Sequence, residues 1–385
     1  MPQEIKILSC IRSMNPEHGG PADFVKSLHQ MQYQDFSLEI ACMDSPESSW
    51  LKGLEPIRAE GPGALGSYSL NLNYLKWLQA NSGRFDLLLV HGLWDFVSVA
   101  ATLSAKASSV PVAVFVHGML DPWFNEAYPL KKLKKEIYWK LVQSSVLSSA
   151  RAVLFNSEVE MLRAQNVFQP YKLNAVLVPY GVPPGNYDLS QAKENFYALF
   201  PQLKERKFFL FFGRITQKKG LDLLIRAFSS LRPEGYCLVI AGPNASDYAQ
   251  ELSVLAQDLA ISEHLLWTGM MSGESKWGAL AAADLFILPS QQENFARAMA
   301  ESLAAGTPVL LSNKVNTWSI VSQYKAGLVC EANEAGTRES LIEWMNMSAS
   351  EKQEMRTAAF TCFKNELNLE TKLQPFLDAM RKLIN

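Results

Sequence analysis

Residues 208–228 read FFLFFGRITQKKGLDLLIRAF. An apolar run ends at Gly213, a short loop carries three cations, and apolar side chains then recur at helical spacing. A run that is apolar on both faces indicates a parallel strand covered by helices on each side. The stretch therefore predicts a strand, a glycine-bounded loop and a helix, the repeating unit of a doubly wound α/β sheet.

Short apolar runs of the same kind recur along the whole chain between helical stretches. In the first half they lie at 5–11, 38–43, 86–92, 112–118, 152–157 and 175–181. In the second half they lie at 208–214, 237–242, 265–269, 284–290, 308–312 and 327–330. Pro and Gly cluster at 179–185, which is typical of an interdomain linker. We predict an α/β fold of two doubly wound parallel-sheet domains, 1–183 and 184–364.

Size and composition narrow the class of protein. The 385 residues are 48% hydrophobic and 19% charged, which is enough to bury two ordinary cores. A net charge of -2 gives no reason to expect nucleic acid. No leader pattern and no run of about eighteen apolar residues is present, so we expect a cytoplasmic protein. The cysteines have no metal-binding spacing and are interpreted as reduced core residues: Cys10, Cys42, Cys237, Cys330 and Cys362.

The loop after the strand at 208–212 carries Arg214, Lys218 and Lys219 and leads directly into a helix. Fixed cations beside a helix N-terminus form an anion site. Arg214 can grip phosphate oxygens with two N–H groups, and Lys219 adds a point charge. Solvated loop cations before an ordinary helix would give the same pattern, so this motif alone leaves both interpretations open.

A second motif, DLFILPSQQENFARAMAESLAAGTPVLLS at 284–312, carries two carboxylates. We expect a strand ending at 289–290, a loop with Glu293, and a helix that starts near 294 and carries Glu301. If helical throughout, the segment separates the carboxylates by about 12 Å, at about 1.5 Å per residue. That span reaches from a sugar across a pyrophosphate to a ribose. Because Glu301 lies among apolar residues, ligand binding is favoured over a solvated position.

Together these motifs resemble the donor site of the retaining family 4 glycosyltransferases, the group 1 type with the GT-B fold. Glu293 and Glu301 match the family's pair of glutamates separated by seven residues. NPEHGGPADFVKSL, at 15–28, is similar to its glycine loop, and HGMLDPW, at 117–123, is similar to the segment after its fourth strand. The resemblance covers nearly the whole chain.

The resemblance implies two Rossmann-like domains facing a central cleft, with a C-terminal helix, about 365–385, returning to the first domain. The second domain would hold a nucleotide-sugar donor. In this scheme Arg214 and Lys219 bind the pyrophosphate, Glu301 the ribose and Glu293 the sugar hydroxyls. The implied catalytic residues are His117, Arg214, Lys219 and Glu293. The implied donor-binding residues are Gly19, Gly20, Gly213, Arg214, Lys219, Met270, Met271, Glu293, Asn294, Phe295, Ala296 and Glu301. Ala296 departs from the family, in which many members carry glycine there.

The implied reaction retains the anomeric configuration, and the departing phosphate takes the acceptor proton. Fixed positive groups would stabilise the charge on the leaving group. Since the chain has no Asp-x-Asp pair, we expect neither a metal nor a cofactor. A UDP-hexose such as UDP-glucose is the favoured donor and GDP-mannose the next. The acceptor would be a glycan or a lipid-linked acceptor in polysaccharide biosynthesis. A sugar-phosphate or sucrose-type synthase and a non-catalytic sugar-nucleotide-binding protein are the alternatives.

Three weaker signals remain. Gly61, Gly63 and Gly66 have dinucleotide-binding spacing, but no strong strand precedes them, so we expect a loop and not an oxidoreductase. His91 is either a packing residue or lies on the acceptor side. Residues 130–143 form a basic amphipathic helix that either contacts an anionic membrane surface or packs on the core with solvated lysines.

Overall fold

The computed structural model describes residues 4–31, 33, 35–123, 125 and 129–384. Residue 385, the end of the expected C-terminal helix, lies outside this part of the chain. The chain divides into two compact units. The first extends to Tyr180 and includes the residues from Leu373 onward, and the second is Gly181–Lys372.

The first unit is built on a parallel sheet in the order β3-β2-β1-β4-β5-β6-β7. Its strands are β1 (Ile5–Ile11), β2 (Phe36–Cys42), β3 (Ile57–Ala59), β4 (Leu87–His91), β5 (Val112–Phe115), β6 (Ala152–Phe155) and β7 (Ala175–Leu177). The central strands β4, β5 and β6 are buried along their whole length, as their apolar runs predict. The sequence patterns missed β3, because this edge strand is short and only partly buried.

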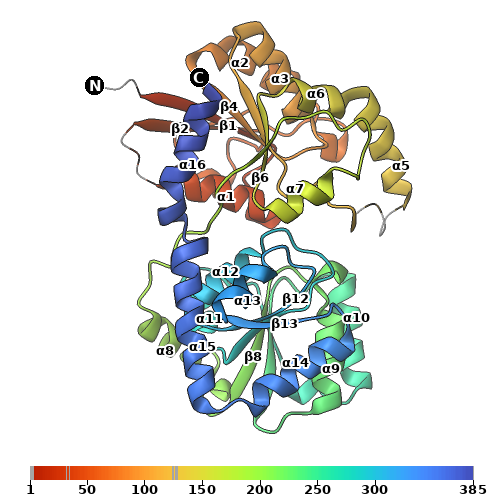
Figure 1. The fold of residues 1–385 in the computed structure, drawn as a ribbon, viewed down its shortest axis with the longest axis vertical. Helices are drawn as coiled ribbons and strands as arrows, with labels where there is room; N and C mark the ends of the chain where they lie inside the picture. Colours follow the sequence, from red (N-terminus) through yellow and green to blue (C-terminus); the bar gives the residue numbers. More distant parts are fainter. Residues whose placement is uncertain (1–3, 32, 34, 124, 126–128, 385) are drawn as a thin grey trace. The chain divides into compact units, whose positions relative to one another are not determined.

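Helices cover both faces of the first sheet (Figure 1). They are α1 (Gly20–His29), α2 (Leu72–Asn81), α3 (Phe96–Ser108), α5 (Pro129–Tyr138), α6 (Ser144–Ser149) and α7 (Glu158–Ala164). Residues Trp139–Gln143 form a π-helical turn between α5 and α6. The glycine-rich segment around Gly63 is a loop ending in a short 3-10 helix, as expected.

The second unit holds a parallel sheet in the order β10-β9-β8-β11-β12-β13. Its strands are β8 (Lys207–Phe212), β9 (Tyr236–Ala241), β10 (Leu265–Gly269), β11 (Leu285–Leu288), β12 (Val309–Ser312) and β13 (Gly327–Cys330). The predicted fold class, two doubly wound parallel sheets, is confirmed. The cysteines are free and buried, also as predicted.

The helices of the second unit again lie on both faces of its sheet (Figure 1). They are α8 (Leu189–Leu199), α9 (Leu221–Leu231), α10 (Asp247–Asp258), α11 (Gly273–Ala282), α12 (Arg297–Ala304), α13 (Trp318–Tyr324), α14 (Glu334–Asn346) and α15 (Ala349–Cys362). The last helix, α16 (Leu369–Ile384), begins in the second unit and ends in the first. In α9 the apolar stripe Leu221, Leu224, Ile225 and Phe228 is fully buried, as its helical spacing predicts.

The strand order places one switch point in each sheet. The chain direction across the sheet reverses between β1 and β4 in the first unit and between β8 and β11 in the second. Ligands of such folds bind beyond the carboxyl ends of the strands at this point. The residues to examine are therefore those that follow these four strands and their immediate neighbours.

Candidate functional site

At the switch point of the second sheet, a glutamate and two lysines form one cluster. Lys219 Nζ lies 2.8 Å and Lys218 Nζ 3.2 Å from the same Glu293 oxygen, Oε1. Burial by itself raises the pKa of Glu293, but the two ammonium groups outweigh burial and lower it to about 2. Burial lowers the pKa of Lys219, and Glu293 opposes this effect. Glu293 is therefore an ionised hydrogen-bond acceptor at neutral pH.

The loops after β8 and β11 hold this cluster in place. Lys219 lies over Gly213, since a Cβ built on Gly213 would lie 4.0 Å from Lys219 Nζ. Lys218 also donates to Gln292 Oε1 at 3.1 Å, and the carbonyl of Lys218 accepts from Gln291 N at 2.8 Å. The predicted phosphate loop and the Glu293 loop are therefore joined by both backbone and side-chain contacts.

The backbone of Glu293 is not helical, which corrects the predicted helix start near 294. Its N–H donates to Lys314 O at 3.2 Å, and its carbonyl accepts from Asn316 N at 2.9 Å. Helix α12 begins only at Arg297, after Ala296 adopts a left-handed conformation with φ 56° and ψ 65°. The distance of about 12 Å, which assumed a continuous helix, therefore does not apply. The helix N-terminus is at Arg297 rather than at Asn294–Ala296.

Glu301 forms a separate cluster on α12. It is only 4% exposed, and its Oε1 accepts from Lys276 Nζ at 2.9 Å and from Arg297 Nε at 3.0 Å. Arg297 lies one turn before Glu301 on the same helix, and Lys276 comes from α11. The burial that favoured a ligand-binding role for Glu301 is thus present, but two cations of the protein already neutralise this carboxylate.

The other predicted donor-binding residues of this unit have different exposures. Arg214 is exposed after β8, and Met270 is 62% exposed after β10 whereas Met271 is buried. Asn294 Oδ1 accepts from Asn316 Nδ2 at 3.2 Å, and the Phe295 carbonyl accepts from Thr317 Oγ1 at 3.4 Å. These two residues are anchored to the loop after β12.

In the first unit, the predicted glycine loop follows β1. Gly19 has φ 78°, a conformation that favours glycine, and it caps the start of α1. A Cβ built on Gly20 would meet nothing within 4 Å. Asp44 fixes the approach to this loop, because its carboxylate accepts from Ser13 Oγ at 2.6 Å and from Met14 N at 2.7 Å. The start of α1 is thus open on the side where Gly20 lies.

Two histidines meet at the carboxyl edge of the first sheet. His117, just after β5, adopts a left-handed conformation with φ 48°, and its Nε2 lies 3.0 Å from His91 Nδ1. Its ring stacks on Phe115 at a centroid distance of 4.2 Å. Burial lowers the pKa of His91 to about 3. The pKa of His117 lies well below its ordinary value, mainly because of burial and to a smaller extent because of the neighbouring His91. The two rings therefore form a neutral pair.

A buried carboxylate that the sequence did not reveal supports the segment after β5. Glu160 on α7 accepts from Gly118 N at 2.5 Å and from Asn156 N at 3.1 Å. Three residues earlier, Ser157 caps the same helix by accepting from Glu160 N. The Ser-x-x-Glu spacing is typical of an ordinary capping box, which is why it gave no functional signal. Lys276 and Arg297, the partners of Glu301, were likewise not predicted.

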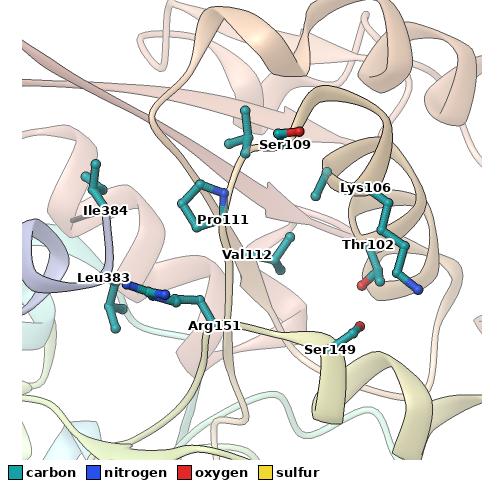
Figure 2. A pocket seen from close by; sticks show the side chains of 11 residues that line it. Thr102, Lys106, Ser109, Pro111, Val112, Ser149, Arg151, Leu383 and Ile384 are labelled. Atoms are coloured by element: carbon teal, nitrogen blue, oxygen red, sulfur yellow. The ribbon is translucent and has the colours of Figure 1, made fainter.

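A cavity of about 430 Å³ in the first unit lies at the opposite edge of the sheet. Its walls include Val112, where β5 begins, and Arg151, just before β6. In Figure 2 Arg151 extends toward Leu383 while Lys106 lies on another wall. Since parallel sheets bind ligands at their carboxyl edge, this cavity is not the predicted donor site. In the part of the chain that the structure describes, no three His, Cys, Asp or Glu residues form a metal-binding group.

Two Rossmann-like parallel sheets are the hallmark of the GT-B class. The model of the glycosyl transferases group 1 family matches residues 196–361, and that of the glycosyl transferase 4-like domain matches residues 47–181. Arg214, Lys219, Glu293 and Glu301 lie within the first range, and His117 lies within the second. The chain belongs to the family 4 glycosyltransferases of the GT-B type.

Individual relatives agree with this assignment. The chain is 31% identical to the D-inositol 3-phosphate glycosyltransferase of Mycolicibacterium smegmatis over 44% of the chain and 39% of the relative. It is 24% identical to the alpha-maltose-1-phosphate synthase of the same organism over 91% and 92%. The solved structure of Anabaena HepE in complex with UDP-glucose has a TM-score of 0.78 at 15% identity, covering 98% of this chain and all of the other. The chain spans only 38% and 39% of the length of two of the curated relatives that it matches.

Proposed function

We propose that this chain transfers a hexose from a nucleotide-sugar donor to an acceptor hydroxyl, with retention of configuration and without a metal ion. The observation that carries the proposal is the cluster of Glu293, Lys219 and Lys218 at the switch point of the second sheet. It offers ammonium groups for phosphates beside a carboxylate for sugar hydroxyls, at the edge where such folds bind ligands.

The protonation states support electrostatic catalysis rather than acid-base catalysis by Glu293. With a pKa of about 2, the Glu293 carboxylate is too weak a base to take a proton at neutral pH and carries none to donate. It can accept hydrogen bonds from sugar hydroxyls and balance Lys219. Lys219, with the exposed Arg214, would stabilise charge that develops on the leaving phosphate.

In the proposed reaction the acceptor oxygen bonds to the anomeric carbon on the face that the phosphate leaves. The bond from that carbon to the phosphate oxygen breaks, and its electron pair stays on the phosphate. The acceptor proton passes to this phosphate oxygen, so atoms and charge balance without a protein nucleophile. Metal independence rests on the missing Asp-x-Asp pair in the sequence.

We favour a UDP-hexose as the donor, and the UDP-glucose complex of the HepE relative supports this choice. GDP-mannose is the next candidate donor. It stays open because no described residue distinguishes uracil from guanine. The name of the alpha-maltose-1-phosphate synthase relative keeps a phosphorylated sugar as an alternative acceptor. Turnover by the purified chain would exclude a non-catalytic sugar-nucleotide-binding role.

The test is a calorimetric titration of the purified chain with UDP, GDP and ADP in EDTA, repeated on Arg214→Ala. We expect one nucleotide to bind without metal and the substitution to weaken its binding by about 2 kcal/mol, the value of a charge-assisted contact. Lys204→Ala, at an exposed position in the same unit, is the matched control. Absence of binding by all three nucleotides to folded protein would contradict the proposed site.

We also propose that the first unit touches an anionic lipid surface through α5 and the turn after it. Its apolar face is exposed rather than packed on the core: Leu130 is 84% and Leu141 76% exposed. Leu133 and Ile137 lie on the same face, also exposed, and no residue of α5 is buried. Exposed leucines beside lysines suit the boundary of an anionic bilayer. No helix within the described residues has the length and apolar character to cross a bilayer.

Vesicle flotation tests this surface. We expect the wild-type chain to float with phosphatidylglycerol vesicles but not with phosphatidylcholine vesicles. Replacing Leu130 and Leu141 by serine should reduce flotation about tenfold, since each loses a large apolar side chain from the lipid. Leu199→Ser, a 63% exposed leucine on α8, is the matched control. Equal binding by both vesicle types, or by the double variant, would contradict a role for this face.

A further inference from the structure

The histidine pair in the first unit contains a ring that the proposed reaction does not use. His91 ends β4, and its backbone lies directly opposite Phe115, the last residue of β5. It is only 3% exposed, and it is enclosed by Phe24, Phe115 and His117 at ring-centroid distances of 6.2, 6.4 and 5.3 Å. His91 is therefore too buried to touch an acceptor, but its Nδ1 contacts His117 Nε2 at 3.0 Å.

A short contact between two neutral imidazoles needs one proton between the two nitrogens. Each neutral ring has one N–H donor and one bare nitrogen acceptor. Either His91 Nδ1 donates to His117 Nε2, or His117 Nε2 donates to His91 Nδ1. The two arrangements differ in what they leave on the other nitrogen of each ring.

The remaining nitrogen of His91 distinguishes the two arrangements. His91 Nε2 is buried and has no hydrogen-bond partner. If His117 donates, the proton of His91 lies on this nitrogen, and a buried N–H is left without an acceptor. If His91 donates, the same nitrogen is only a bare acceptor. Orphaned buried N–H groups are rarer in proteins than under-used acceptors, so donation from His91 is favoured.

We propose that His91 is a positioning residue that donates from Nδ1 to His117 Nε2 and thereby fixes the His117 proton on Nδ1. His117 is only partly buried, and its Nδ1–H then serves as a fixed donor to a ligand oxygen. A ring without this partner would exchange between two tautomers, and only one of them could donate from this nitrogen. This inference rests on the proposed function only for the identity of the oxygen.

The neighbouring contacts support a fixed ring. The His117 ring is stacked on Phe115, and its backbone precedes Gly118, whose N–H is held by the Glu160 carboxylate at 2.5 Å. Phe24 meets both imidazoles edge to face. Aromatic packing therefore fixes the position of the His117 ring, and Glu160 fixes the backbone beside it. The tautomer of His117 is the property that remains for His91 to control.

The test measures the tautomer in full-length protein labelled with ¹⁵N-histidine, in the absence of any donor. Long-range ¹H–¹⁵N correlation spectra separate the two neutral tautomers, and His91→Asn and His117→Asn assign the signals. We expect His117 to carry its proton on Nδ1. A proton on His117 Nε2 in the wild-type protein would overturn the inference, whatever its activity.

Two variants then separate positioning from packing. His91→Asn places an amide N–H donor near the position of Nδ1, whereas the ionised carboxylate of His91→Asp offers only acceptors there. We expect the asparagine variant to keep the His117 tautomer and the aspartate variant to move the proton to Nε2. Transfer by His91→Asp should be about tenfold or more slower than by His91→Asn. Equal rates with equal tautomers would overturn the inference.

Two outcomes distinguish this inference from the proposed function. If the wild-type tautomer is as expected but no nucleotide-sugar is turned over, the proposed function fails and the assignment of His91 stands. If transfer occurs but His117 carries its proton on Nε2, the proposed function stands and the assignment of His91 fails. Should His91→Asp not fold, the spectra of the wild type and of His91→Asn still decide the question.

Discussion

The carboxyl edges of the two sheets occupy similar positions in their units but differ in electrostatics. The second unit gathers charge, with two ammonium groups on one Glu293 oxygen. At the corresponding edge of the first unit, the two histidines lie among aromatic rings and stay neutral. Paired ions suit the binding of a phosphate, whereas neutral rings suit directional hydrogen bonds that add no net charge. The same fold element thus serves two kinds of contact.

The largest expected effect comes from removing one charge of the second unit. Lys219→Ala should slow transfer about 100-fold or more, because loss of a preorganised group that stabilises developing charge costs about 3 kcal/mol. Lys218→Ala should cost less than about tenfold, since Lys218 lies farther from Glu293 and also contacts Gln292. Initial rates with the donor identified by titration would measure both. Equal losses in the two variants would contradict a distinct role for Lys219.

Predictability from sequence differed between the two edges. The residues of the charged edge could be singled out from the sequence, because Lys219 and Glu293 lie in contiguous motifs whose residue types suggest binding of phosphate and sugar. Their roles in binding stay a prediction. Their direct contact was not predicted, because it joins loops after different strands. The strand and helix runs also predicted both sheets, apart from the short edge strand β3.

The neutral edge was harder to predict. His91 ends β4 and His117 follows the neighbouring strand β5, and only the sheet register brings their rings together. Glu160 gave no functional signal, because the Ser-x-x-Glu spacing that it forms with Ser157 is typical of a helix cap. The predicted start of α12 near residue 294 was wrong, because the backbone turns left-handed at Ala296 and the helix begins only at Arg297. Local patterns thus gave residue types and elements, but not contacts between distant segments.

The next effect separates the edges by pH. The folded pKa of His91, about 3, is below its unfolded value of 6.5, so the unfolded chain binds the extra proton. Its contribution to stability is full above pH 6.5 and is lost as the pH falls toward 3. At pH 5 the loss is about 2 kcal/mol. Urea unfolding at pH 7, 6 and 5 should therefore show the wild type losing stability relative to His91→Asn.

The charged edge should respond in a lower window. Glu293 has a folded pKa of about 2 against an ordinary 4.5, so its contribution is present above pH 4.5 and is lost as the pH falls toward 2. Glu293→Gln is the variant that lacks this dependence. If the wild type and His91→Asn changed in parallel between pH 7 and 5, the neutral character of the histidine pair would be wrong.

The smallest expected effect concerns a feature that both edges share, a non-glycine residue in the left-handed conformation. His117 has φ 48° and Ala296 has φ 56°. Ala296→Gly should relieve backbone strain of about 1 kcal/mol but remove a buried methyl group worth about 0.8 kcal/mol. The free energy of unfolding should therefore stay within about 0.5 kcal/mol of the wild type. Ala300→Gly, inside the same helix, is the control and should cost about 2 kcal/mol, because helix propensity and burial are both lost. Urea unfolding would measure the free energy of unfolding of both variants. If Ala296→Gly lost as much stability as Ala300→Gly, the left-handed turn before α12 would carry no strain that glycine can relieve.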